Sequence, residues 1–191
     1  MVIGLTGGIG CGKSAAAAFF AEAGCRIIDT DQLAREVLNS PACIEKLVRR
    51  WGRDCLGSDG LPMRPWIASK VFADEDERLF LESVTHPEVT RMRKEATRDS
   101  AVNYVVEIPL LFEKKLAADF DLIVCVAASD TVRLGRLRTR GLSDDDIHRR
   151  IKSQLTLVEK VRLSDVVIWN DGSLEFLHAQ VGSVIQDYAR A

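Results

Sequence analysis

The chain has 191 residues, of which 47% are hydrophobic and 28% charged, and its formal net charge is −2. These values are typical of one globular domain with room for an inserted lobe, and the weak net charge gives no global basic field that would bind nucleic acid. No apolar run reaches the length of a membrane span, and the N-terminus lacks the features of a signal peptide. The five cysteines are an odd number without a C-x-x-C pair, which favours reduced thiols over disulfides or a zinc site. We therefore expect a cytoplasmic protein with neither nucleic acid nor membrane as a partner.

The N-terminal stretch IGLTGGIGCGKSAAAAFF predicts a phosphate-binding loop between a strand and a helix. Residues 2–5 are an apolar run typical of a buried strand, and residues 14–23 are alanine-rich and predict a helix. Between them, Gly7, Gly12, Lys13 and Ser14 fit the pattern G-x-x-x-x-G-K-[ST]. Such glycines let backbone N–H groups converge on a phosphate, the lysine reaches the β- and γ-phosphates, and the hydroxyl can ligate Mg²⁺. An ordinary glycine-rich turn is the weaker interpretation.

A second strand is predicted at residues 25–28, ending at Asp29, and a helix follows with Asp31 near its start and Arg35 one turn on. Residues 40–100 indicate an inserted, mainly helical lobe, because apolar residues recur there at helical spacing and no long strand is evident. We expect this lobe to be broken at Pro41, at 57–62, at Pro65 and at Pro87.

Three more apolar runs predict buried strands, at residues 103–111, 121–128 and 165–170. The segments that follow favour helices at 131–140, at 143–155 with Ser143 as N-cap, and at 173–189. Strands that alternate with helices imply a parallel sheet covered on both faces, with ligands at the carboxyl ends of the strands. That edge would bring together the phosphate loop and the polar residues Asp29, Asp31, Glu107 and Asn170.

Small kinases fit this pattern better than other nucleotide-binding classes. Regulatory GTPases need a guanine-reading N-K-x-D motif, which the sequence lacks, and motor-type ATPases need a longer chain. Residues 133–152 carry seven basic side chains, which indicate either an arginine-rich lid or a solvated helix face. Phosphoryl transfer needs cations around the moving phosphoryl group and must exclude water, so beside a phosphate loop the lid is the favoured interpretation.

Over nearly its whole length the chain resembles the dephospho-coenzyme A kinases. The resemblance is carried by IGLTGGIGCGKS at 3–14, IDTDQLAREV at 28–37, LESVTHP at 81–87, IPLLFE at 108–113, RLRTRGLS at 136–143, RRIKSQ at 149–154 and DVVIWNDGS at 165–173. It implies an α/β P-loop fold: a three-layer sandwich whose five-stranded parallel sheet carries a helical acceptor lobe and a lid. In this single kinase domain the core would span about 1–30, 101–136 and 156–191, the lobe about 31–100 and the lid about 137–155.

The resemblance also implies the reaction and its ATP site. The γ-phosphoryl group of ATP would pass to the ribose 3′-hydroxyl of dephospho-coenzyme A, with Mg²⁺ held by Ser14, water and the phosphates. ATP would contact the loop and the segment after the last strand through Gly8, Ile9, Gly10, Cys11, Gly12, Lys13, Ser14 and Asn170. Arg136 and Arg140 match lid arginines, so that Lys13, Asp31, Arg136 and Arg140 form the implied catalytic set.

The implied acceptor residues each have a structural alternative. Asp31 matches a catalytic aspartate that accepts the hydroxyl proton, but it could also cap its helix. Arg35 could orient Asp31, meet substrate phosphate or form a surface ion pair. Thr6 could lie near the acceptor or brace a loop, and His86 could contact the acceptor or fix the backbone of the lobe. Glu107 could hold Mg²⁺ through water or be structural.

Three residues depart from the family pattern. Arg133 stands where the family often has glutamine, and no role is carried over to it. Ala15 replaces a common threonine, and Cys11 replaces a common serine within the loop. A thiol among loop N–H groups near a helix N-terminus predicts a lowered pKa, so we expect Cys11 to be the most readily alkylated cysteine and to be protected by Mg-ATP.

Two other functions stay open at this stage. One is a nucleoside-monophosphate kinase or another small-metabolite kinase, and the other is a module that senses ATP without transferring phosphate. Lys13, Asp31 and Arg136 together argue against a pure sensor. The sequence leaves open whether the protein is a monomer or a homo-oligomer.

Overall fold

The computed structural model describes residues 1–188, which form two compact units. The sheet unit comprises Met1–Asp29 and the chain from Asp99 onward, and the helical unit comprises Thr30–Arg98. No described helix is long and apolar enough to cross a membrane.

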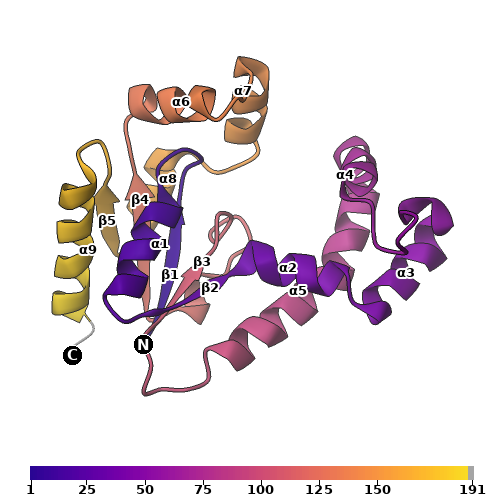
Figure 1. Cartoon of the computed structure of the whole chain (residues 1–191), viewed down its shortest axis with the longest axis horizontal. Coiled ribbons are helices and arrows are strands. Elements are labelled where there is room, and N and C mark those ends of the chain that lie inside the picture. Colours follow the sequence, from indigo (N-terminus) through magenta and orange to yellow (C-terminus); the bar gives the residue numbers. More distant parts are fainter. Residues whose placement is uncertain (189–191) are drawn as a thin grey trace. The chain divides into compact units, whose positions relative to one another are not determined.

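The sheet unit contains one five-stranded sheet in which every neighbouring pair is parallel, as predicted (Figure 1). The strand order is β2-β3-β1-β4-β5. Strands β2 and β3 lie on one side of β1 in the sheet, and β4 and β5 lie on the other side. The direction of strand addition therefore reverses at β1, which is the topological switch point where such sheets bind ligands. The strands are β1 Val2–Gly7, β2 Arg26–Asp29, β3 Tyr104–Glu107, β4 Leu122–Ala127 and β5 Val166–Trp169.

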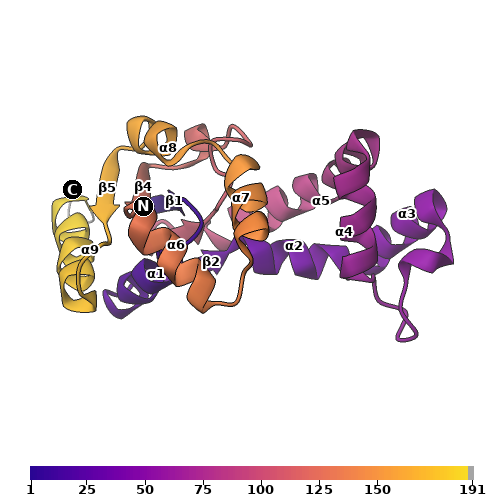
Figure 2. The ribbon, with the colours of Figure 1, turned by 90° about the horizontal axis from the view of Figure 1, so that it is seen from above.

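Helices cover both faces of this sheet, and Figure 2 shows α1 and α8 on opposite sides of the strands. Helices α1 and α9 pack against each other on one face, where the largest core cluster joins Phe20 and Leu177 to Ile3, Leu5 and Val124 of the central strands. The α-helices of this unit are α1 Lys13–Glu22, α6 Asp130–Thr139, α7 Asp144–Lys152, α8 Leu157–Leu163 and α9 Leu174–Tyr188. The last residue of the helix predicted at 173–189 lies outside the described residues.

The helix expected at 143–155 is shorter in the structure, where α7 ends at Lys152. A separate helix, α8, begins at Leu157. Helix α8 starts at a capping box in which the Thr156 hydroxyl accepts from Glu159 N–H and the Glu159 carboxylate accepts from Thr156 N–H. The predicted N-cap at Ser143 is confirmed, since its hydroxyl accepts from Asp146 N–H.

Within the described residues the helical unit has no strand, only an isolated bridge between Leu56 and Pro62. Its α-helices are α2 Thr30–Leu38, α3 Pro41–Trp51, α4 Arg64–Ala73 and α5 Glu75–Ala96. The break predicted at Pro87 is wrong, because this proline lies inside the 22-residue helix α5. Proline removes one helical hydrogen bond, and here packing of α5 against both α2 and α4 keeps the helix continuous.

Candidate active site

The phosphate loop lies between the end of β1 and the start of α1. Gly12 is the N-cap of α1 and has a φ of 93°, and a Cβ placed there would lie 2.2 Å from Asn170 Nδ2. Gly10 has a φ of 81°, and a Cβ there would lie 2.9 Å from the backbone oxygen of Arg133. Both positions need glycine for conformation and for space. The loop thus leads directly into the N-terminus of α1, and a glycine-rich loop before a helix N-terminus is the arrangement that binds phosphate.

Polar residues follow the strands at the same edge of the sheet, as predicted. Parallel pairing aligns Leu5 of β1 with Glu107 of β3, and Glu107 with Asp29 of β2. The Ser14 hydroxyl lies 3.4 Å from Glu107 Oε1. Hydroxyl and carboxylate oxygens are ligands that Mg²⁺ accepts, usually together with water and nucleotide phosphates. These two side chains fit the needs of a magnesium ion delivered with ATP.

Arg136 on α6 points a guanidinium nitrogen toward the loop. A Cβ placed on Gly12 would lie 3.7 Å from Arg136 Nη1, and this nitrogen is buried without a hydrogen-bond partner among the described residues. A buried cationic donor left without a partner is costly, so its position indicates an anionic ligand. Arg140, one helical turn later, is the C-cap of α6 and is exposed.

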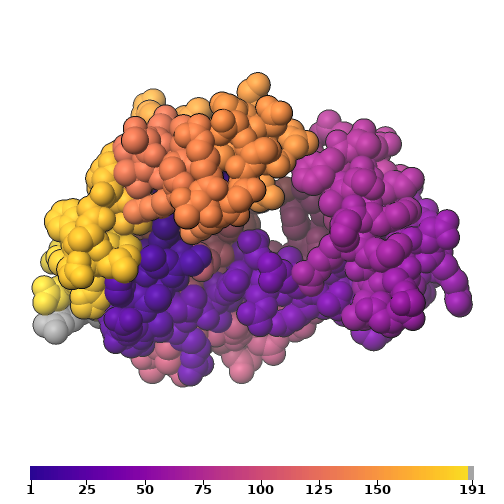
Figure 3. All heavy atoms as spheres, turned by 45° about the horizontal axis from the view of Figure 1, so that its top comes forward, coloured from indigo at the N-terminus to yellow at the C-terminus, as the bar shows by residue number. Residues whose placement is uncertain are grey.

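Two buried side chains from outside the loop bind its backbone. Arg133 is 6% exposed, and its Nε donates to the Ile9 carbonyl at 3.2 Å while its Nη1 pairs with Asp130 at 3.0 Å. Asn170 is 3% exposed, and its Nδ2 donates to the Cys11 carbonyl at 2.8 Å. Figure 3 shows orange atoms of the segment containing α6 beside indigo atoms of the N-terminal segment. Asn170 was expected beside ATP, whereas the sequence alone assigns no role to Arg133.

A second buried network lies next to the loop, around the Pro109 carbonyl. This oxygen accepts from Lys160 Nζ at 2.6 Å and from the Thr6 hydroxyl at 3.5 Å. Lys160 is fully buried and also pairs with Glu113 at 2.9 Å. Thr6 is fully buried as well, so in this structure its hydroxyl braces the loop after β3. Sequence reasoning missed Lys160, whose helix α8 was not recognised.

The expectation that the pKa of Cys11 is lowered is wrong. Its side chain is fully buried in the core cluster beneath the loop. Burial raises the pKa of the Cys11 thiol above its usual value, and this effect outweighs the lowering by the Arg133 charge and by backbone hydrogen bonds at Ala128 and Gly8. Because its pKa is raised and its surface is buried, we expect this thiol to react slowly.

The other predicted acceptor residues belong to the helical unit, each on a described helix. Asp31 is the second residue of α2 and is exposed, so it lies in the first turn rather than at the cap position before the helix. Arg35 is exposed one turn later on the same helix, and His86 is exposed on α5.

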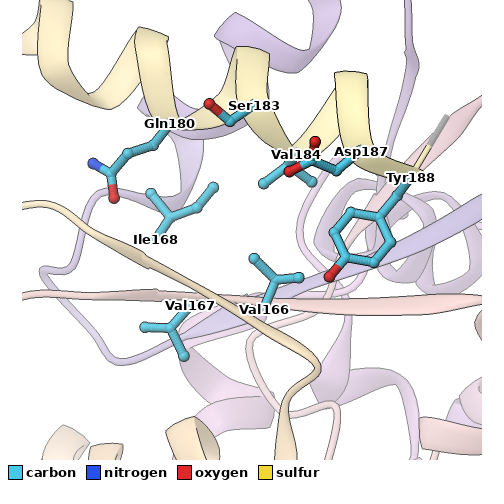
Figure 4. A pocket seen from close by; sticks show the side chains of 8 residues that line it. All are labelled: Val166, Val167, Ile168, Gln180, Ser183, Val184, Asp187 and Tyr188. Atoms are coloured by element: carbon cyan, nitrogen blue, oxygen red, sulfur yellow. The ribbon is translucent and has the colours of Figure 1, made fainter. Parts of the chain in front are cut away.

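A shallow pocket of about 250 Å³ lies elsewhere in the sheet unit, between β5 and α9 (Figure 4). Its lining mixes apolar and polar side chains, and its one charged residue is Asp187, which would repel phosphate. The lining residues are Val166, Val167, Ile168, Gln180, Ser183, Val184, Asp187 and Tyr188. This pocket lacks the chemistry of a nucleotide site.

Comparison with known proteins identifies the family. The family model for dephospho-CoA kinase matches residues 1–175. A dephospho-CoA kinase of Corynebacterium glutamicum is 39% identical over 97% of this chain and 96% of its own length. Among solved structures, a Thermus thermophilus protein superposes with a TM-score of 0.85 at 34% identity, covering 98% of this chain and 97% of its own. A dephospho-CoA kinase from Campylobacter jejuni superposes with a TM-score of 0.76 at 25% identity, covering 99% and 97%. With a phosphate loop at the switch point of a parallel sheet and relatives matched over almost their full length, the chain belongs to the dephospho-CoA kinase family.

Proposed function

We propose that the protein transfers the γ-phosphoryl group of Mg-ATP to the ribose 3′-hydroxyl of dephospho-coenzyme A, giving coenzyme A and ADP. One structural observation carries the ATP half of this proposal. The buried, unpartnered Nη1 of Arg136 lies next to Gly12 at the N-terminus of α1, where phosphate would supply the missing acceptor. The acceptor half is supported by the family.

In the ATP site, the N–H groups of the phosphate loop and the ammonium of Lys13 bind the phosphates. Ser14 would hold Mg²⁺ and Glu107 would accept hydrogen bonds from its water shell, and the ion would neutralise charge on the phosphates. Arg136, with the exposed Arg140, stabilises the charge that develops on the transferred group. The segment 137–155 is proposed to act as a lid that excludes water from the reaction.

Asp31 accepts the proton of the 3′-hydroxyl as the new O–P bond forms, while the bond between the γ-phosphorus and the β,γ-bridging oxygen breaks and ADP leaves. Support for this role is the D-T-D sequence at 29–31 together with its place directly after β2. Arg35 and His86 are proposed to contact the acceptor. We also propose that the protein is cytoplasmic and that ATP and dephospho-coenzyme A are its partners, with neither nucleic acid nor membrane among them.

A coupled assay of ADP release tests the choice of acceptor. Dephospho-coenzyme A, AMP, UMP and shikimate are compared at equal concentrations with Mg-ATP. We expect dephospho-coenzyme A to give the highest kcat/KM by at least about 10³, because sites that bind a specific acceptor leave buried polar groups unpaired with the wrong one. Comparable rates with AMP would replace the proposal by a nucleoside-monophosphate kinase. ATP binding with no ADP release from any acceptor would indicate a sensor.

A further inference from the structure

The phosphate loop is fixed from outside at two of its peptide groups. The Ile9 carbonyl accepts from Arg133 Nε at 3.2 Å, and the Cys11 carbonyl accepts from Asn170 Nδ2 at 2.8 Å. The peptide between these two is fixed within the loop, because Cys11 N–H donates to the Gly8 carbonyl at 3.2 Å. Three successive peptide groups are thus each held by a hydrogen bond.

Holding a carbonyl also aims an N–H group. A trans peptide is planar, so its C=O and N–H bonds point in opposite directions. Ile9 C=O belongs to the same peptide as Gly10 N–H, and Cys11 C=O to the same peptide as Gly12 N–H. When Arg133 and Asn170 draw the carbonyls outward, the N–H groups of Gly10 and Gly12 are directed to the other side of the loop, which is the side that binds an anion.

Both side chains are themselves held rigidly. Arg133 is 6% exposed and Asn170 is 3% exposed, so neither has a solvated alternative position. The Arg133 guanidinium is further fixed by Asp130, and a Cβ on Gly8 would lie 3.4 Å from its Cζ. A Cβ on Gly12 would lie 2.2 Å from Asn170 Nδ2, which shows how closely the amide approaches the loop.

We propose that Arg133 and Asn170 are positioning residues that preorganise the phosphate loop, each by orienting one N–H donor toward the ATP phosphates. The proposal rests on the loop being the ATP site. Neither side chain needs to touch the nucleotide, because each acts through a peptide group. Preorganised donors bind an anion without the cost of ordering the loop first.

The test uses two variants that keep a side chain of similar length but remove the donor, Arg133→Met and Asn170→Leu. We expect each to weaken ADP binding and raise the KM for ATP about tenfold, the equivalent of about one net hydrogen bond. The kcat should stay within about threefold, and the KM for the acceptor should not change, since uniform binding of ATP is lost. Arg133→Lys should recover most of the affinity, because an ammonium still donates to the carbonyl. Arg162→Met, which changes an exposed arginine on α8, is the matched control.

Amide exchange in the free protein separates orientation of the loop from general loosening. In both variants we expect faster exchange at Cys11, whose N–H donates to the Gly8 carbonyl, with exchange at Ile3 and Leu5 of β1 unchanged. Equal acceleration in β1 would overturn the proposal, because the residues would then act on the fold as a whole. An unchanged KM for ATP would also overturn it.

Lys13→Met distinguishes failure of this proposal from failure of the ATP site. If Lys13→Met weakens ADP binding while Arg133→Met and Asn170→Leu do not, the ATP site stands and the positioning role is refuted. If Lys13→Met leaves ADP binding intact, the ATP site itself is wrong.

Discussion

Replacing Lys160 with methionine removes the charge partner of a buried carboxylate while nearly keeping side-chain volume. Lys160 is fully buried, and its ammonium bonds Pro109 O at 2.6 Å and Glu113 Oε1 at 2.9 Å. Glu113 Oε1 also accepts from Leu155 N–H at 2.8 Å, and Oε2 is buried without a partner among residues 1–188. After the substitution, the backbone N–H of Leu155 is the donor that remains to this carboxylate among residues 1–188.

Removing one partner of a buried ion pair costs about 3–5 kcal/mol, because the other charge is left uncompensated. The Glu113 side chain is 16% exposed and keeps Leu155 N–H, so we take the lower end, about 3 kcal/mol. For a chain of this size each kcal/mol lowers Tm by about 2–4 °C, which gives a decrease of about 6–12 °C. Thermal melting and urea unfolding of Lys160→Met measure both quantities.

A second substitution checks that the uncompensated charge causes the loss. In the Lys160→Met background, Glu113→Gln removes the buried charge and keeps an acceptor for Leu155 N–H, so about 1–2 kcal/mol should return. A loss below about 1 kcal/mol for Lys160→Met would refute the reasoning. A double variant less stable than Lys160→Met would refute it as well.

Four further outcomes are expected. Asp31→Asn should lower kcat by a factor of about 10²–10⁴ through loss of the base, and a near-normal kcat would contradict this. The free energy of unfolding should change by less than about 1 kcal/mol, because an exposed carboxylate in the first turn gains no more than that from the helix dipole. Cys11, fully buried, should be alkylated after Cys25, which is 7% exposed, and peptide mapping that finds Cys11 first would be contrary evidence. Side-chain hydrogen bonds from Arg50 and Trp51 lower the pKa of Glu77. The stability that these bonds supply is therefore present above the ordinary carboxyl pKa and is lost as the pH falls through the lowered value. Acid titration followed by Trp51 fluorescence should report this loss, and an identical titration of Glu77→Gln would argue against it. ATP together with the acceptor should slow amide exchange across 137–152, and protection confined to the phosphate loop would contradict the assignment of this segment as a lid.

The parts of the fold with strong local signals could be predicted from the sequence. Runs such as 122–128 are apolar throughout because β4 is buried on both faces. The glycine pattern before Ser14 marks a backbone that other residues cannot adopt. Such signals depend on a few neighbouring residues, and therefore survive without knowledge of the tertiary structure.

The features that were missed depend on contacts between distant parts of the chain. Arg133 reaches Ile9 across 124 positions, and Lys160 reaches Pro109 across 51, so no local pattern announces either contact. The local preference of proline predicts a helix break at Pro87, and the packing of α5 overrides this preference. The Cys11 pKa was judged from nearby N–H groups, whereas burial of the thiol in the core decides its direction.

The position of the new phosphate on the product tests the central claim most directly. The purified protein is incubated with Mg-ATP and dephospho-coenzyme A, and the product is examined by phosphorus NMR. We expect a new phosphomonoester on the ribose 3′-oxygen, formed in step with ADP. A phosphate at another oxygen, or a 5′-diphosphate formed from AMP with comparable kcat/KM, would contradict the assignment.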